Sequence, residues 1–120
     1  MGEQTMTKKI LVIDDDPIIV KYLVNLFRDN GYETCAAADG KTAYDVAVEE
    51  KPDLITLDLD MPEQWGPRFY RRLSKNAALK DTPIIVISGI DGDHAIRKAV
   101  AFFRKPFDAD KLIGVINKTI

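Results

Sequence analysis

Short apolar runs bounded by charged or turn-forming residues recur along the chain. The first run, Lys8–Ile13, is followed by three consecutive aspartates and predicts a short buried strand. Asp16 and Pro17 then form a pair typical of a helix start, and apolar side chains repeat at helical spacing up to Asn30 and Gly31, where a helix end is favoured. This part of the chain therefore predicts a strand, a turn and a helix in that order.

The same alternation continues to the end of the chain. The further predicted strands are 33–37, 54–58, 83–88 and 101–103, and the further predicted helices are 41–50, 66–74 and 109–120. Strands that alternate with helices form parallel sheets through right-handed crossovers, with helices on both faces. The pattern thus predicts a doubly wound α/β fold with a five-stranded parallel sheet.

Polar side chains stand at the predicted carboxyl ends of these strands. They are Asp14 and Asp15 after the first strand, Asp58 at the end of the third, Ser88 at the end of the fourth and Lys105 just after the last. Because α/β folds bind ligands at the carboxyl ends of their parallel strands, these side chains are expected to form one functional site.

The chemistry of this site starts from its carboxylates. Two carboxylates about 4 Å apart repel each other by roughly 4 kcal/mol at an effective dielectric constant of about 20. A hard divalent cation such as Mg²⁺ prefers oxygen ligands and would offset that repulsion. A lysine and a hydroxyl beside a metal are typical of sites that stabilise a phosphoryl group in transfer, and an aspartate can itself accept that group. Asp16, the third aspartate of the triplet, has a different predicted role as a helix N-cap.

Composition limits the partners and the location. A length of 120 residues with 46% hydrophobic residues suits one domain, predicted to span residues 8–120 after a disordered tail at 1–7. The net charge of −2 provides no basic stripe, so direct nucleic-acid binding is not expected. The apolar runs are too short to cross a bilayer and the N-terminus lacks a secretory signal, which predicts a cytoplasmic protein without membrane insertion.

Four fragments in this order resemble the receiver domain of two-component response regulators. They are "VIDDDP", "PDLITLDLDMPEQWG", "PIIVISG" and "FFRKPF", and the resemblance covers the chain from Lys8 to Ile120. It implies the flavodoxin-like strand order 2-1-3-4-5. It also implies that Asp58 accepts a phosphoryl group from a histidine kinase or phosphotransfer protein, with Mg²⁺ as cofactor. The domain would then change conformation and signal to a downstream protein partner, and the resemblance also allows a homodimer.

The resemblance implies a set of metal ligands. Asp14 and Asp15 match the acidic pair that holds Mg²⁺ in this family. Asp58 and the backbone carbonyl of Asp60 would complete the ligands that the protein provides.

The resemblance also implies residues that respond to the phosphoryl group. Ser88 matches a switch hydroxyl, and Lys105 matches the lysine that pairs with the phosphoryl oxygens. Phe102 matches an aromatic switch position three residues before the lysine. The peptide bond before Pro106 is expected to be cis.

The sequence departs from the family between the fourth and fifth strands. Ser88 and Lys105 lie 17 positions apart. The usual spacing is longer by about five residues, which is more than one helical turn. The fourth helix of the family is therefore expected to be short or irregular here. The surface that the family forms from this helix, the fifth strand and the last helix, and uses for dimerisation and output, is expected to be non-standard.

Two other interpretations of the site stay open. Asp58-Leu59-Asp60 resembles the first motif of haloacid-dehalogenase-type phosphatases, whose first aspartate is the nucleophile and whose second is the general acid, but Met61-Pro62 follows it here. The second alternative is a degenerate receiver that serves only as an interaction module. A receiver would label itself stoichiometrically and would not act as a turnover enzyme.

The chain reaches its last residue at the end of the last predicted helix. A stand-alone receiver and a fragment of a larger regulator are both compatible with this length.

Overall fold

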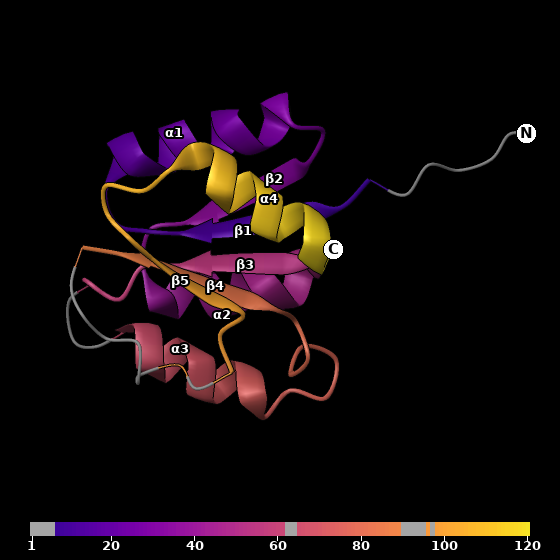
Figure 1. Cartoon of the computed structure of the whole chain (residues 1–120). Helices are drawn as coiled ribbons and strands as arrows, with labels where there is room; N and C mark the ends of the chain where they lie inside the picture. Colours follow the sequence, from indigo (N-terminus) through magenta and orange to yellow (C-terminus); the bar gives the residue numbers. More distant parts are fainter. Residues whose placement is uncertain (1–6, 62–64, 90–95, 97) are drawn as a thin grey trace, which may run out of the picture.

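The sheet at the centre of the fold has five parallel strands in the order β2-β1-β3-β4-β5 (Figure 1). The structure is a computed structural model that describes residues 7–61, 65–89, 96 and 98–120. Its strands are β1 (Lys9–Ile13), β2 (Glu33–Ala37), β3 (Leu54–Leu57), β4 (Ile84–Ser88) and β5 (Ala101–Arg104). The predicted doubly wound sheet and its strand order are confirmed.

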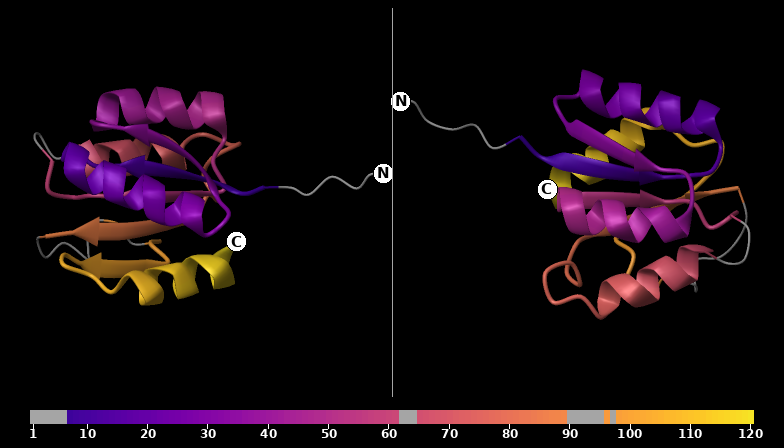
Figure 2. Two further views of the ribbon diagram at one scale, coloured as in Figure 1. Left: turned by 90° about the horizontal axis from the view of Figure 1, so that it is seen from above. Right: turned by 180° about the vertical axis from the view of Figure 1, so that it is seen from behind.

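Helices cover both faces of this sheet, as the views in Figure 2 show. The helices in the described residues are α1 (Pro17–Asp29), α2 (Gly40–Glu50), α3 (Trp65–Ser74) and α4 (Ala109–Thr119). Side chains of α1 and α4 pack on one face, and those of α2 and α3 pack on the other. None of the helices in this part of the chain is long and apolar enough to span a bilayer.

Two predictions fall largely on residues that the structure does not describe. The expected short or irregular helix between β4 and β5 includes residues 90–95 and 97, and the expected disordered tail includes residues 1–6. Within the segment between β4 and β5, the described residues 89, 96 and 98–100 contain no helix. The helix labelled α4 is therefore the one that follows β5.

The three central strands consist mostly of apolar residues because both of their faces are covered. Leu11 and Ile13 of β1 pack toward α2 and α3, and the alternate side chain of Val12 packs toward α1 and α4. Thr56 in β3 breaks this apolar pattern. Its buried hydroxyl has no hydrogen-bond partner within the described part of the chain.

An aspartate caps the N-terminus of three of the helices. The N-cap residues of α1, α2 and α4 are Asp16, Asp39 and Asp108. The Asp16 carboxylate accepts a hydrogen bond from the backbone N–H of Ile18 at 2.9 Å. Such a cap satisfies an N–H group that has no partner within the helix and places a negative charge at the positive end of the helix dipole. The predicted capping role of Asp16 is confirmed.

Two glycines in helices should respond in opposite ways to replacement by alanine. A Cβ atom at Gly40 would lie 2.7 Å from Trp65 Cβ and 2.9 Å from the Trp65 carbonyl oxygen, whereas one at Gly114 would meet nothing within 4 Å. We expect Gly40→Ala to lower the free energy of unfolding by about 1–3 kcal/mol through overpacking. Gly114→Ala should raise it by about 0.5–1 kcal/mol through helix propensity. Urea denaturation measures both changes, and a neutral Gly40→Ala would contradict the close contact between α2 and α3.

Candidate functional site

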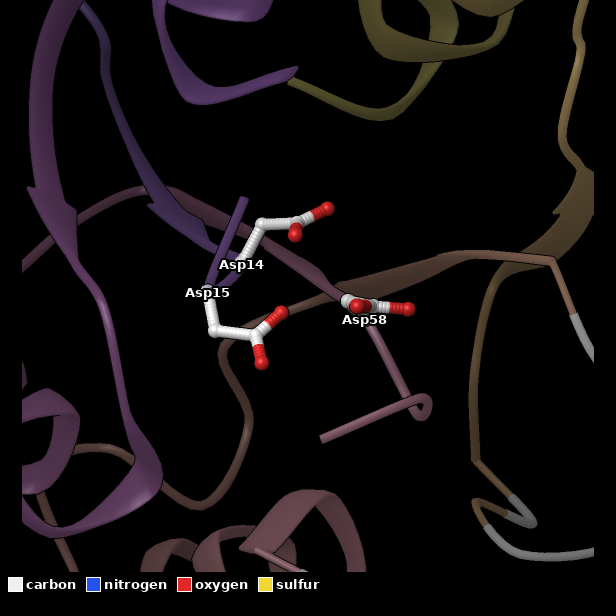
Figure 3. A group of neighbouring side chains, drawn as sticks. All are labelled: Asp14, Asp15 and Asp58. Carbon is white, nitrogen blue, oxygen red and sulfur yellow. The ribbon is translucent and has the colours of Figure 1, made fainter. Parts of the chain in front are cut away.

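The predicted polar side chains come together at the carboxyl edge of the sheet. Asp14 and Asp15 follow β1, which lies between β2 and β3, and Asp58 follows β3. One carboxylate oxygen from each of these three aspartates lies within 4.8 Å of the others. In Figure 3 the three side chains point into a common space.

Backbone hydrogen bonds between neighbouring strands hold these positions. The Asp58 N–H donates to the Ile13 carbonyl at 3.0 Å, and the Lys105 N–H donates to the Ser88 carbonyl at 2.9 Å. The bonding between parallel strands thus continues one residue beyond β3 and beyond β5. The side chains of Asp58 and Lys105 are therefore carried by ordered backbone and not by free loops.

The side chains of the site differ in their exposure to solvent. Asp14 and Asp58 are each only 2% exposed, and Ser88 is fully buried. Asp15 is exposed. A ligand that approaches from solvent would thus meet Asp15 before it reached the two buried carboxylates.

The environment of Asp58 acts on its pKa in both directions. Burial is the largest influence and raises the pKa of this carboxyl, and the nearby Asp14 carboxylate raises it further. The Asp60 N–H donates to Asp58 Oδ1 at 3.0 Å and lowers the pKa, as do the Lys105 charge and a hydrogen bond with the Ser88 side chain. The net shift is upward. A cation beside Asp58 would favour its ionised form.

Lys105 provides the positive charge at the centre of the site. Its Nζ lies 2.8 Å from Asp14 Oδ2 and 3.7 Å from Asp58 Oδ2. Burial alone would lower the pKa of the Lys105 ammonium, but the hydrogen bond to Asp14 and the charges of both aspartates outweigh it and raise the pKa. Lys105 is therefore a cation at neutral pH. The peptide bond between Lys105 and Pro106 is cis, as expected.

The donor set of the site suits a hard divalent cation. All three groups that converge are carboxylates, and oxygen ligands of this kind are what Mg²⁺ prefers. One lysine cannot neutralise three carboxylates, so the cluster keeps a negative charge that a cation would balance. The residues present therefore fit a magnesium ion. Binding of the metal by the Asp60 backbone carbonyl stays a prediction.

The model of the response regulator receiver domain family matches residues 10–117 of this chain. The chain belongs to the response regulator receiver family. Protein Rrf1 of Nitratidesulfovibrio vulgaris is 34% identical over 116 residues, which cover 96% of this receiver domain and 84% of Rrf1. The polar-differentiation response regulator DivK of Brucella ovis is 31% identical over 93% of this chain and 95% of DivK.

Solved structures agree with this family. The chemotaxis response regulator CheY4 of Vibrio cholerae matches this receiver domain with a TM-score of 0.84 and 26% sequence identity, over 96% of this chain and 100% of CheY4. Receiver domains are phosphoryl-accepting signalling domains, and Mg²⁺ and phosphorylation are typical of them. The predicted function of a phosphoryl-accepting signalling domain is confirmed, and the haloacid-dehalogenase alternative has no support.

A groove in this receiver domain was not predicted from the sequence. It has a volume of about 500 Å³ and extends from Asp14 and Asp15 between α1 and the end of β2. Its apolar walls include Val20 and Val24 on one side and the alanines at 36–38 on the other. The three consecutive alanines are the sequence feature from which the groove could have been predicted, because small side chains at a strand end leave space that larger ones would fill.

The predicted aromatic switch position lies on the opposite side of the receiver domain from this groove. Phe102 in β5 is half-buried and packs against the cluster under α2 and α3, whereas Phe103 packs against the cluster under α1 and α4. The switch role of Phe102 stays a prediction.

Proposed function

We propose that this receiver domain accepts a phosphoryl group on Asp58 from a phosphohistidine of a histidine kinase or phosphotransfer protein. The observation that carries the proposal is the position of Asp58 beside the Lys105 ammonium, with 3.7 Å between Oδ2 and Nζ. An Asp58 oxygen would form the new bond to phosphorus while the bond from phosphorus to the donor nitrogen breaks. The imidazole of the donor leaves with that electron pair and takes up a proton.

The neighbouring groups have separate roles in this transfer. The Lys105 ammonium would stabilise negative charge on the phosphoryl oxygens, and the Ser88 hydroxyl would donate a hydrogen bond to them once the group is on Asp58. Asp14, Asp15 and Asp58 would hold Mg²⁺, with the Asp60 carbonyl as a further ligand. When bound, this ion supplies positive charge that stabilises the transferring group and reduces the repulsion among the carboxylates.

Phosphorylation would then change the signalling state of the domain. The modification adds about −1.5 to −2 charges and three acceptor oxygens at one point. We propose that Ser88 and Phe102 respond to it and shift the domain between two conformations, of which a downstream protein partner binds one better. A homodimer and a cytoplasmic location belong to the same proposal, as does a receiver domain that spans residues 8–120.

The proposal is tested by the mass of the intact protein. Incubated with Mg²⁺ and acetyl phosphate, the chain should gain the mass of one phosphoryl group and lose it again on removal of the donor. The absence of any gain would contradict the proposal and favour a receiver that serves only as an interaction module. Sustained hydrolysis of a phosphate ester without a labelled chain would indicate a phosphatase instead.

Two adjacent aspartates provide a matched test of the metal site. Asp15→Asn removes one of the three carboxylates and should weaken Mg²⁺ binding at least about tenfold, or about 1.4 kcal/mol. Asp16→Ser retains a good N-cap and should leave the affinity nearly unchanged. The rise of the melting temperature with Mg²⁺ concentration measures both affinities. An equal loss in the two variants would contradict the separate roles of Asp15 and Asp16.

A further inference from the structure

Helices α2 and α3 pack against each other on one face of the sheet, as the rear view in Figure 2 shows. The Arg72 guanidinium of α3 lies 3.9 Å from the centre of the Tyr44 ring of α2. At the start of both helices, a Cβ atom at Gly40 would lie 2.7 Å from Trp65 Cβ. These contacts place Tyr44, Trp65 and Arg72 along one boundary between the two helices.

Two arginines of α3 stack on aromatic rings at this boundary. The Arg68 guanidinium lies 5.5 Å from the centre of the Trp65 ring, and Arg72 stacks on Tyr44. Both arginines are exposed, and because they are four residues apart they lie on the same side of α3. A guanidinium stacks through its flat face and keeps its N–H donors at its edge. Stacking therefore holds both groups in place and leaves them donors that can bind a carboxylate.

The Tyr44 ring is held at two points and has an apolar neighbour at the surface. Besides the Arg72 contact, its hydroxyl accepts a hydrogen bond at 3.0 Å from the side-chain amide of Asn76, which lies just after α3. Val48 follows Tyr44 by one turn on the same side of α2 and is 43% exposed. A fixed ring and an exposed apolar side chain thus lie next to the stacked arginines.

This set of residues has the composition of a protein interface. We call it the α2–α3 surface and define it as Tyr44, Val48, Trp65, Arg68 and Arg72. Tryptophan, tyrosine and arginine are the residues that most often dominate the binding energy of interfaces. Side chains that are already held in place lose less conformational entropy on binding. Packing between the helices accounts for the aromatic rings, but it does not need two exposed charges or an exposed valine.

The acidic residues of α2 lie on other sides of that helix. Asp45 and Glu49 are about 100° and 140° around the helix from Tyr44. Glu50 forms an ion pair with Lys9 at 2.7 Å. The carboxylates of α2 are therefore placed away from the side that carries Tyr44, and the α2–α3 surface has a positive charge.

We propose that the α2–α3 surface binds an acidic helix of a protein partner. Arg68 and Arg72 are separated by four residues, or about 6 Å along the axis of α3. Two carboxylates one turn apart on the partner helix would match this spacing and accept charge-assisted hydrogen bonds from both guanidinium groups. An apolar residue one turn beyond this acidic pair would contact Val48. The proposal rests on the proposed signalling function and extends it, because it names the chemistry of a partner.

The charge and the number of apolar side chains favour a protein over other anionic partners. A nucleic acid needs many phosphate contacts for tight binding, whereas this surface has two arginines in a chain that is acidic overall. A membrane surface requires several inserted apolar side chains beside the basic ones. Val48 is the one aliphatic residue of the defined surface. A helix with two carboxylates and one apolar contact matches what the surface has.

Peptide selection tests the proposal, because the partner need not be identified first. The library displays a helical peptide with randomised exposed positions, and the wild-type chain is the target. We expect the enriched peptides to share two acidic residues at i and i+4 and an apolar residue one turn beyond the pair. A synthetic peptide of the same composition, with its acidic residues at i and i+2, should bind at least about tenfold more weakly, because these positions do not share a helix face.

Substitutions in the chain locate the binding site of the enriched peptides. Fluorescence anisotropy gives their dissociation constants, which Arg68→Gln combined with Arg72→Gln should raise at least about tenfold. Val48→Ser, which removes no ring contact, should raise them less. The matched control is Lys111→Gln combined with Lys118→Gln, which removes two exposed charges from α4 on the opposite face of the sheet and should leave the constants unchanged.

A second pair of variants separates binding from loss of structure. Arg68→Lys combined with Arg72→Lys retains both charges but lacks the planar fork, so its affinity should lie between those of the wild type and the glutamine variant. Urea denaturation shows whether each variant is folded at the temperature of the binding measurement. If the arginine variants do not fold, Val48→Ser and the peptide with altered spacing decide the outcome.

Several outcomes would overturn the proposal. They are the absence of any enriched peptide, enrichment of peptides that are not acidic, equal binding of the peptide with altered spacing, and equal weakening in the α4 control. Displacement of the peptides by a single-stranded oligonucleotide or by anionic lipid vesicles at lower concentration would exclude a protein helix. Asp58→Asn should bind the same peptides as the wild type, so failure of this test is distinguishable from failure of phosphoryl transfer.

Discussion

Asp58→Asn should gain no phosphoryl group from acetyl phosphate and Mg²⁺ under conditions in which the wild-type chain gains one. The substitution retains the size of the side chain but replaces a carboxylate by an amide, which is a poor nucleophile. The initial rate should fall by more than about a thousandfold, the scale on which loss of a nucleophile acts in enzymes. Intact-mass spectrometry over a time course measures this rate.

Asp60→Asn is the matched control for this prediction. Asp60 lies two residues from Asp58 and undergoes the same chemical change, but its side chain is exposed, whereas Asp58 is 2% exposed. The variant should be phosphorylated at nearly the wild-type level, because only its backbone carbonyl is proposed to bind the metal. An equal mass gain in Asp58→Asn would place the acceptor elsewhere. A loss confined to Asp60→Asn would indicate a general acid at that position.

Lys105→Met should destabilise the chain in the absence of divalent cations, by about 3 kcal/mol. The Lys105 ammonium is 2.8 Å from one buried carboxylate and 3.7 Å from another, and its removal takes away the cation that pairs with both. Removing one partner of a buried ion pair costs about 3–5 kcal/mol, and the 21% exposure of the Lys105 side chain favours the lower end of that range. Urea denaturation in the presence of a chelator measures the loss.

Magnesium distinguishes this electrostatic effect from a general loss of packing. A cation bound by Asp14 and Asp58 would replace part of the missing charge, so Mg²⁺ should raise the stability of Lys105→Met by more than that of the wild type. Lys111→Met, at an exposed position on α4, should change stability by no more than about 0.5 kcal/mol in either condition. Equal responses to Mg²⁺ in Lys105→Met and the wild type would contradict the role of Lys105 as the cation of the site.

The fold could be predicted from the sequence because the residue patterns that mark its strands and helices are local. Apolar runs such as that of β1, and the aspartate before Pro17, mark the starts and ends of elements within a few residues of chain. The candidate site was accessible for a related reason. In a parallel sheet, every residue just after a strand lies at the same edge, so Asp14, Asp58 and Lys105 could be grouped from their places in the chain alone.

The remaining features depend on contacts between distant segments. The resemblance to receiver domains pairs Lys105 with a phosphoryl group, whereas in the structure its ammonium bonds to Asp14. The Thr56 hydroxyl has no hydrogen-bond partner among the residues that the structure describes, and a pocket is lined by Tyr70, Ile84 and Val100; both features depend on how several elements pack together. Periodicity and spacing contain no information about such packing, because each feature is created by side chains that are far apart in the chain.

The contact between Trp65 and Gly40 has a practical consequence for kinetic work. Trp65 is the single tryptophan of the chain, and it is the first residue of α3, seven positions after Asp58. Its ring lies close to Gly40 at the start of α2, and the Arg68 guanidinium lies 5.5 Å from the ring centre. Ultraviolet excitation of this indole therefore gives an emission that originates at one known place, close in the chain to the proposed acceptor. Stopped-flow measurements of rapid events at that edge of the sheet need no attached dye.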